Sequence, residues 1–536
     1  MKEVVLILGG GLMQLPAIQA AGELGLLRHM ADGNPACPGR TLVEHFHYVD
    51  LRDRRGLLEL AQGISGLNGV FTAGTDFSRS VAYVAEHLGL PGITEDVAIG
   101  ATDKAVMRGR LEAAGVSVPP HRLVKQDGEL PPFGFPVIVK PVDNMGARGV
   151  VLVRSADEYA GAVKKARGLS PSGKVIVEQF IPGQEYSLDA LIYDGNVRIT
   201  GVGERHIFFS PYFVELGHTI PAQMAPEEQA VLEAEFVKAI HALGISRGAA
   251  KGDVFLHRDN LGRPKATIGE VAARLSGGFM SGWTYPEATG VPLTRLGLEI
   301  SLGRSPSADQ FKPTRHRVSA ERALISGPGT VRAVTVPDVT DDEVVGVFVH
   351  VSPGDRVAPP RNNVEKAANV IVTSSTAAEA SRRAAELLDE IRVYLEPDDT
   401  ESEAFFFRDG WNDRYCRYRL PAAAASRSGE AHESLAQSTD TTAAVDELHR
   451  ASRGGEGPLR VCPPMTFSFN VEELENNQIS ISAATLLERL LSEDLIELNA
   501  AARVDGSRVF WRAFLAGGRQ GVDHVFTTVR HSRMRP

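Results

Sequence analysis

Residues 133–150 read FGFPVIVKPVDNMGARGV and place a lysine at the entrance to a glycine-containing loop. Residues 137–139 are all β-branched, which predicts a buried strand that ends near Lys140. The residues that follow, among them Gly146 and Gly149, are typical of a turn. Backbone amides in such a loop can bind phosphate oxygens, and a lysine ammonium beside them adds positive charge. The alternative is an ordinary hairpin with a surface lysine, so the rest of the chain must decide.

Length and composition favour a multidomain globular protein. The chain has 536 residues, which predicts roughly three or four domains. Its net charge of −10, without a Lys/Arg block, argues against a nucleic-acid partner. Cys37, Cys416 and Cys462 have no CxxC spacing, so we expect a reducing cytoplasm, no zinc site, and cysteines that act as small hydrophobic residues.

The N-terminal part predicts a parallel α/β layer over residues 1–100. An apolar run at 4–8 leads through three glycines into a helical pattern at about 16–26. A second strand at 70–72 precedes a helix at 77–88. GGGLMQ lacks the full GxGxxG spacing, so a Rossmann-like layer is favoured over a dinucleotide site. No apolar run reaches about 18 residues, so we expect neither a signal peptide nor a membrane span.

A helix expected at 103–114 carries Lys104 in its first turn, where a cation is unfavourable unless it faces an anion. This placement indicates phosphate binding, although a solvated surface lysine is the default for Lys104 alone. A strand at 151–153 and a helix at 156–166 follow the glycine-containing loop.

The stretch VIVEQF, residues 175–180, predicts a buried strand that carries Glu178. A Pro-Gly pair and a further strand at 185–192 follow it. Such a junction is a plausible seam between two lobes, where backbone groups can bind a flat ligand. The alternative is that Glu178 is an exposed acid on an edge strand.

A helix at 230–243 precedes two strands joined by the turn HRDNLGRP. This hairpin can place Asp253 opposite Glu270 on one face. Two opposed carboxylates suit a divalent cation such as Mg²⁺. Arg274, four residues after Glu270, is expected on the same face, where a guanidinium can hold an anion. The alternative is a solvent-facing hairpin with a salt bridge.

The last third of the chain predicts a small α+β unit followed by a linker. Its expected elements are strands at 331–336, 344–351 and 369–373 and a helix at 376–391. Residues 421–458 are rich in Ala, Ser, Gly and Thr, which indicates a flexible linker. Beyond residue 459 we expect a helix at 483–498 and strands at 508–514 and 524–529, without an assigned function.

The order of six segments resembles that of the ATP-grasp superfamily. The segments are GGGLMQLPAIQAA, GTD, TDKAVMRGRLEAAGVSVP, FPVIVKPVDNMGARGV, VEQFIPGQEYSLDA and GEVAARLSGGF. The resemblance covers roughly residues 1–395. EVAARLSGGF and FVELGHTIPAQM look more like the carboxylate–amine ligases, including L-amino-acid ligases, than like carbamoyl-phosphate synthase or biotin carboxylase.

The resemblance implies a multidomain chain of α/β and α+β class. Its expected parts are a Rossmann-like preATP-grasp domain at 1–100, a two-lobed ATP-grasp domain at 101–305 with a mobile lobe at about 120–180, a small α+β domain at 306–396, an extension and linker at 397–458, and an extra C-terminal domain at 459–536.

The resemblance also implies roles for single residues. The implied ATP-binding residues are Lys104, Lys140, Gly146, Gly149, Glu178, Gln179, Phe180, Ile181 and Glu185. The lysines would contact phosphates, residues 143–149 would close over them, residues 178–181 would bind adenine, and Glu185 would contact the ribose. The implied metal ligands are Asp253 and Glu270, and the implied catalytic residues are Arg274 and Lys140.

Arg274 would steady an acyl phosphate. Many family members have Asn two residues after the metal-binding Glu, where this chain has Ala272, so fewer protein groups would hold a second Mg²⁺. The expected substrate contacts are Glu215, His218, Ser276 and Gly277, with His218 equally well explained as a loop histidine.

The expected activity is ATP-dependent joining of a carboxylate to an amine through an acyl phosphate, with ATP and Mg²⁺, or Mn²⁺ instead, as cofactors. The expected partners are small-molecule carboxylates and amines, without nucleic acid or membrane, and a homodimer is among the expectations. Two alternatives stay open. One is a bicarbonate-using carboxylase of the biotin or purine-pathway type, and the other is a non-catalytic nucleotide-binding regulator.

Overall fold

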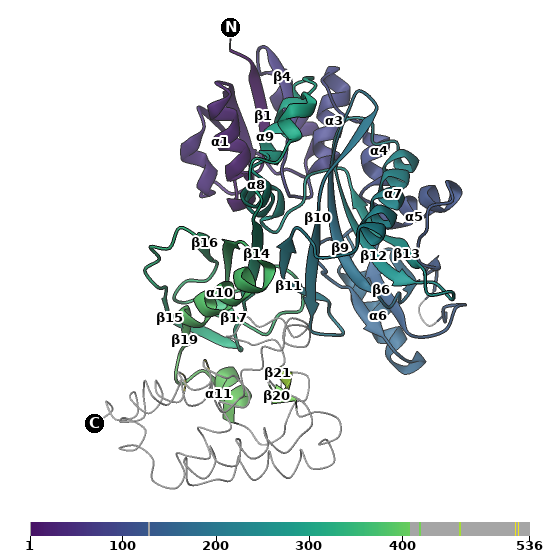
Figure 1. Cartoon of the computed structure of the whole chain (residues 1–536), viewed down its shortest axis with the longest axis vertical. Helices are drawn as coiled ribbons and strands as arrows, with labels where there is room; N and C mark the ends of the chain where they lie inside the picture. The colour runs from purple at the N-terminus through teal and green to yellow at the C-terminus, as the bar shows by residue number, and fades with distance from the viewer. Residues whose placement is uncertain are drawn as a thin grey trace. The chain divides into compact units, whose positions relative to one another are not determined.

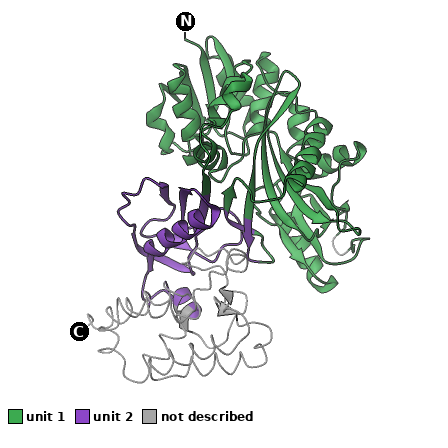
Figure 2. Cartoon of the chain, in the orientation of Figure 1, with its two compact units in different colours: residues 1–205, 210–213, 218–319 green, residues 206–209, 214–217, 320–536 purple. Residues whose placement is uncertain are grey.

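The computed structural model describes residues 2–126, 129–407, 418–419, 460–461, 520 and 524. It divides into two compact units (Figure 2). Unit 1 contains residues 1–205, 210–213 and 218–319, and unit 2 contains residues 206–209, 214–217 and 320–536. The finer boundaries expected from the sequence stay predictions. The expected linker, the helix at 483–498 and the strand at 508–514 lie outside the described residues, as does the strand at 524–529 apart from His524, which is helical.

Unit 1 begins with a parallel sheet of order β3-β2-β1-β4, which confirms the expected α/β layer. Figure 1 labels two of its strands, β1 and β4. Its strands are β1 (Val4–Leu8), β2 (Leu27–Asp32), β3 (His45–Tyr48) and β4 (Leu67–Phe71). All five residues of β1 are buried. Val5 and Ile7 pack with α1 (Leu15–Glu23), whereas Leu6 and Leu8 pack with α2 (Arg54–Gln62) and α3 (Ser78–Leu88). Burial on both faces explains why β1 is apolar throughout.

A four-stranded antiparallel sheet of order β5-β8-β6-β7 follows. Its strands are β5 (His121–Leu123), β6 (Val137–Pro141), β7 (Val151–Val153) and β8 (Val175–Gln179). Helix α6 (Ala156–Gly168) packs Tyr159 and Val163 against the β-branched residues of β6. Two helices precede this sheet, α4 (Glu95–Gly100) and α5 (Lys104–Ala113).

The remaining strands of unit 1 include an antiparallel set of order β13-β12-β9-β10. They are β9 (Gln184–Tyr193), β10 (Asn196–Phe208), β12 (Gly248–Arg258) and β13 (Pro264–Ala272). Helix α7 (Pro226–Leu243) covers one face with Leu232 and Phe236. Gly252 is required there, because a Cβ atom on it would lie 2.5 Å from the Phe236 ring.

Shorter elements complete unit 1. They are η1 (Leu12–Gln14), η2 (Pro38–Leu42), η3 (Met280–Thr284), α8 (Tyr285–Thr289), α9 (Leu293–Ser301) and η4 (Ala308–Phe311). None of the helices in the described part of the chain is both long and apolar enough to cross a membrane.

Unit 2 has the small α+β architecture that the sequence predicts. Its elements are β14 (Val318–Leu324), β15 (Gly329–Thr335), β16 (Val344–Val349), β17 (Arg356–Val357), β18 (Ala368–Ser374), α10 (Ala377–Glu390), β19 (Arg392–Leu395), α11 (Thr400–Phe407), β20 (Tyr418–Arg419) and β21 (Arg460–Val461). Helix α10 packs Leu387 and Leu388 against Val370 and Val372 of β18. Strands β10, β14 and β11 (Val214–Ile220) have residues in both units.

Candidate active site in unit 1

A buried ion-pair cluster surrounds Lys140 at the end of β6. The Lys140 ammonium lies 2.8 Å from Oε2 of Glu178 on the neighbouring strand β8. The Arg108 guanidinium donates to both oxygens of the same carboxylate, at 2.8 and 3.2 Å. Burial alone would raise the pKa of Glu178, but Arg108 and Lys140 lower it to about 2. Glu178 is 3% exposed, so the alternative of an exposed edge acid is wrong.

Lys104, the first residue of α5, is also buried, so the default of a solvated lysine is wrong. Its ammonium donates to the Asn144 carbonyl at 2.8 Å and lies 3.4 Å from Oε1 of Glu270. Its backbone N–H donates to the carbonyl of Val142, the residue just after β6. Helix α5 therefore starts directly against the loop that residues 143–149 form.

That loop has the backbone geometry that its glycines allow. Gly146 and Gly149 have φ values of 61° and 77°, and Ala147 between them has a φ of 59°. A Cβ atom on Gly146 would meet no atom within 4 Å. The base of the loop is tied down by Asp143, whose carboxylate accepts from the Ser170 hydroxyl at 2.6 Å. The base is thus anchored, whereas there is open space beside Gly146.

Asp253 and Glu270 are direct cross-strand partners on β12 and β13, as the sequence predicts. Asp253 forms ion pairs with Arg205, at 2.7 Å, and with Lys251. Burial raises the pKa of Glu270, but nearby cations, Lys104 foremost, lower it to about 2. Both carboxylates are therefore held among positive charges.

The donor set fits a divalent cation that protein and phosphate share. Mg²⁺ is commonly bound by one or two carboxylates together with phosphate oxygens and water. Ala272 offers no side-chain oxygen, and no group of three or more His, Cys, Asp or Glu side chains suited to a metal occurs within the described ranges. Asp253 and Glu270 would thus supply only part of the coordination sphere.

Arg274 lies in the loop just beyond β13, which ends at Ala272, so the expected strand pleat does not determine its direction. Its Nη1 donates to the Leu275 carbonyl at 2.8 Å. The next residue, Ser276, donates its backbone N–H to Asp189 at 3.0 Å and its hydroxyl to the same carboxylate. Gly277 touches Gly74, since a Cβ on Gly277 would lie 2.7 Å from the Gly74 carbonyl oxygen. The Arg274 loop is thus fixed from two sides.

Residues 178–181, the expected adenine-binding segment, connect the sheet that bears Lys140 to β9. The Gln179 and Phe180 amides donate to the Pro120 and Pro136 carbonyls. The Phe180 ring stacks on Phe213, with centroids 6.4 Å apart, and Ile181 is half-buried. Glu185, the expected ribose contact, forms an ion pair with Arg205.

The expected substrate contacts do not all lie in one unit. His218 is buried in β11, where its Nε2 lies 2.8 Å from the Thr284 hydroxyl, so it is no loop histidine. Glu215 belongs to unit 2, and its backbone N–H donates to the Asn363 side chain at 2.9 Å. Their roles toward a substrate stay predictions.

Sequence reasoning missed Arg108, Asp189 and Asp76. Asp189 is fully buried within the apolar strand YSLDALIY, and that acid in an apolar run was a usable signal. Asp76, in the GTD segment, has its pKa raised by burial, whereas Arg274 opposes that rise. Arg108 carried no local signal.

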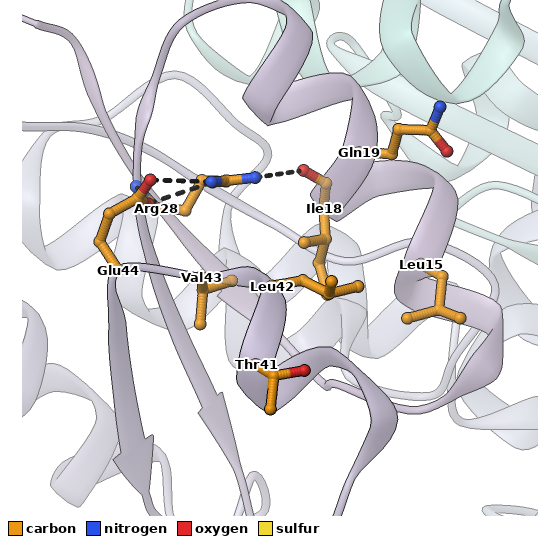
Figure 3. Close-up of a pocket in the computed structure, with 8 residues that line it drawn as sticks. All are labelled: Leu15, Ile18, Gln19, Arg28, Thr41, Leu42, Val43 and Glu44. Atoms are coloured by element: carbon orange, nitrogen blue, oxygen red, sulfur yellow. Dashed lines mark hydrogen bonds and ion pairs between the residues drawn. The ribbon is translucent and has the colours of Figure 1, made fainter.

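A separate pocket of about 690 Å³ lies beside α1 (Figure 3). An ion pair between Arg28 and Glu44 spans 2.8 Å at its edge. Its lining residues, none of them a predicted site residue, are Leu15, Ile18, Gln19, Arg28, Thr41, Leu42, Val43 and Glu44.

Comparisons with known families match two parts of the chain. Residues 133–280 match the ATP-grasp domain, and residues 322–396 match the L-amino acid ligase C-terminal domain 2. A D-alanine--D-alanine ligase from Gloeobacter violaceus is 32% identical over 266 residues, which is 46% of this chain and 79% of that protein.

Carnosine synthase 1 from Gallus gallus is 25% identical over 362 residues. The match covers 61% of this chain but only 38% of that longer protein. Among solved structures, the L-amino acid ligase from Bacillus licheniformis has a TM-score of 0.64 at 23% identity, over 74% of this chain and 99% of that one. This last likeness concerns the fold.

Proposed function

Because this chain belongs to the ATP-grasp superfamily, in its carboxylate–amine ligase branch, we propose that it joins a carboxylate to an amine and converts ATP to ADP and phosphate. One observation carries the proposal. The Lys104 ammonium lies 3.4 Å from the Glu270 carboxylate. A cation that can bind phosphate therefore lies next to a carboxylate that can bind a metal ion. That pairing suits a nucleotide triphosphate with its cation.

The phosphates would bind to Lys104 and Lys140, with residues 143–149 as a lid above them. Lys140 is 8% exposed and already paired with Glu178, so its position is set before a nucleotide arrives. Preorganised charges of this kind stabilise a transferring phosphoryl group without rearrangement. Asp253 and Glu270 would hold Mg²⁺, with Mn²⁺ as an alternative. The cation would supply charge neutralisation at the phosphates.

The reaction would proceed in two steps. A carboxylate oxygen attacks the γ-phosphorus, and the bond to the β-phosphate oxygen breaks, so that ADP leaves and an acyl phosphate forms. The amine nitrogen then attacks the acyl carbon, phosphate departs with the electrons of the C–O bond, and the nitrogen loses a proton. Arg274 would stabilise the negative charge in both steps, and the lid would keep water from the acyl phosphate.

Amino acids or similarly small metabolites are the proposed substrates. A guanidinium at Arg274 suits a carboxylate or phosphate. Ser276 and Gly277, in the same loop, are proposed as contacts to the rest of a small substrate. His218 of unit 1 is proposed as a further substrate contact, and the role of Glu215 in unit 2 stays a prediction. The cytoplasmic location and the homodimer stay predictions.

The test is an incubation of the full chain with ATP, Mg²⁺ and pools of amino acids. We expect ADP and phosphate only when acceptor pairs are present, with a new amide detected by mass spectrometry. A Lys140→Ala variant should be inactive in the same assay. ADP formation that depends on bicarbonate instead of an amine would favour a carboxylase, and silence across broad pools would contradict the proposal.

A further inference from the structure

Arg108 lies one turn after Lys104 in α5 and is fully buried. Residues four apart share one face of a helix, so both cations point to the same side. The next arginine on the helix, Arg110, is partly exposed and forms an ion pair with Asp96 at 2.8 Å. Of the two arginines, Arg108 therefore contacts the candidate active site, whereas Arg110 does not.

The Arg108 guanidinium bridges two separate sheets. On one side, Nε and Nη2 donate to Glu178 on β8, at 2.8 and 3.2 Å. On the other side, the same Nη2 donates at 2.5 Å to the carbonyl of Gly269 on β13. Gly269 directly precedes Glu270, and Glu178 holds Lys140 at 2.8 Å. A single side chain thus touches the partner of the phosphate lysine and the strand of the metal carboxylate.

We propose that Arg108 is a positioning residue that couples nucleotide binding to Mg²⁺ binding. It orients the Lys140 ammonium through Glu178 and holds the backbone next to Glu270 through the Gly269 carbonyl. This inference rests on the proposed function, which supplies ATP and Mg²⁺ as the ligands. A ligand that shifts one side of the bridge then changes the geometry on the other.

The chemistry of the contacts requires arginine. A planar guanidinium can donate to both carboxylate oxygens and to a carbonyl at once, whereas a lysine ammonium on a flexible stem cannot reproduce that fork. Without the fork, the Lys140 ammonium and the backbone beside Glu270 lose the group that fixes their positions. Groups that must be ordered on binding lower the affinity, and we expect a loss of roughly 10-fold. The loss should therefore be measurable in binding alone.

The experiment measures binding of a non-hydrolysable ATP analogue to the full chain by calorimetry, with and without Mg²⁺. In the presence of Mg²⁺ we expect Arg108→Lys to bind the analogue at least roughly 10-fold more weakly than the unmodified chain does. We also expect added Mg²⁺ to raise the affinity of this variant by a smaller factor. Arg110→Lys, two residues along the same helix, is the matched control and should bind as the unmodified chain does.

A second pair of variants covers the case in which Arg108→Lys fails to fold. Glu178→Gln keeps one acceptor oxygen for Arg108 as well as the Arg108 contact to Gly269, so the bridge between the two sheets remains. Arg108→Met with Glu178→Gln removes both links and leaves neither an unpaired arginine nor an unpaired glutamate. We expect added Mg²⁺ to raise the nucleotide affinity of the single variant but not that of the double variant.

Two results would overturn the inference. One is an Arg108→Lys protein with a lower melting temperature but an unchanged nucleotide affinity and an unchanged gain from Mg²⁺. The other is an equal gain from Mg²⁺ in the Glu178→Gln and double variants. A failure of the proposed function looks different, because the unmodified chain would then form no amide in the ligase assay, whatever Arg108→Lys does to nucleotide binding.

Discussion

The Lys104 ammonium lies 3.4 Å from Oε1 of Glu270, although the two residues are 166 positions apart in the chain. Lys104 opens a helix and Glu270 lies two residues before the end of a hairpin strand, so tertiary packing alone brings them together. The pair places an ammonium group and a carboxylate side by side in the site. A metal–phosphate complex has the complementary arrangement, since its cation can approach Glu270 while its phosphate approaches Lys104.

Replacement of Lys104 by methionine should lower kcat/KM by about 100-fold, because a buried donor to the phosphates is lost while the volume is kept. ADP release at varied ATP concentration measures this effect. Lys312→Met is the control, because the Lys312 side chain is 74% exposed and forms an ion pair with Asp309. Equal losses in both variants would show that Lys104 has no special role.

Asp253→Asn and Glu270→Gln should each raise the Mg²⁺ concentration needed for half-maximal activity by about 10-fold or more. Each change removes a charge from an oxygen donor and leaves its neighbouring cations unbalanced. A Mg²⁺ titration at saturating ATP gives the measurement. Glu112→Gln, on an exposed position of α5, should leave the requirement unchanged. The metal assignment fails if both site variants keep the original requirement.

The sequence predicts much of this fold because local patterns suffice for it. Apolar β-branched runs predict β1 and β6, and the hairpin turn places Asp253 opposite Glu270. The buried charges are different. Arg108 meets Glu178 across 70 residues, and no periodicity in a helix tells which strand its arginine will contact.

Loop directions are equally hidden from the sequence. The strand ends at Ala272, so a pleat count cannot orient Arg274. The loop is instead held by Asp189, which lies 87 residues away from Ser276. Such a contact depends on the packing of two strands and a loop, and only the acid inside an apolar strand hints at it.

Asp189 should make stability depend on pH. Burial raises its pKa from 3.8 to about 6, although the hydrogen bonds from Ser276 oppose the rise. Since the folded pKa lies above the unfolded one, the favourable contribution is present below about pH 4 and is lost as the pH rises through 6. Relative to Asp189→Asn, the unmodified chain should lose about 2–3 kcal/mol of stability between pH 4 and pH 7.

Denaturant unfolding of both proteins at several pH values measures this difference. The asparagine keeps a carbonyl oxygen and does not ionise, so it isolates the charge. A difference in unfolding free energy that is constant from pH 4 to pH 7 would contradict the prediction.

Gly74→Ala should impair the Arg274 loop without touching a charged group. A Cβ atom at position 74 would lie 2.8 Å from Gly277 Cα and 3.0 Å from the Ser276 carbonyl oxygen, so backbone must move. We expect kcat to fall by about 10- to 100-fold with little change in the KM for ATP, because the shifted loop carries Arg274 and not the phosphate lysines.

Gly109→Ala in α5 is the matched control for that change. A Cβ there would meet no atom within 4 Å, and alanine favours a helix by about 1 kcal/mol over glycine. This variant should keep full activity and melt at a higher temperature. Steady-state kinetics measure kcat and KM for both variants, and thermal unfolding measures their melting temperatures. If Gly74→Ala kept its kcat, the close contact between residues 74 and 277 would have no part in placing Arg274.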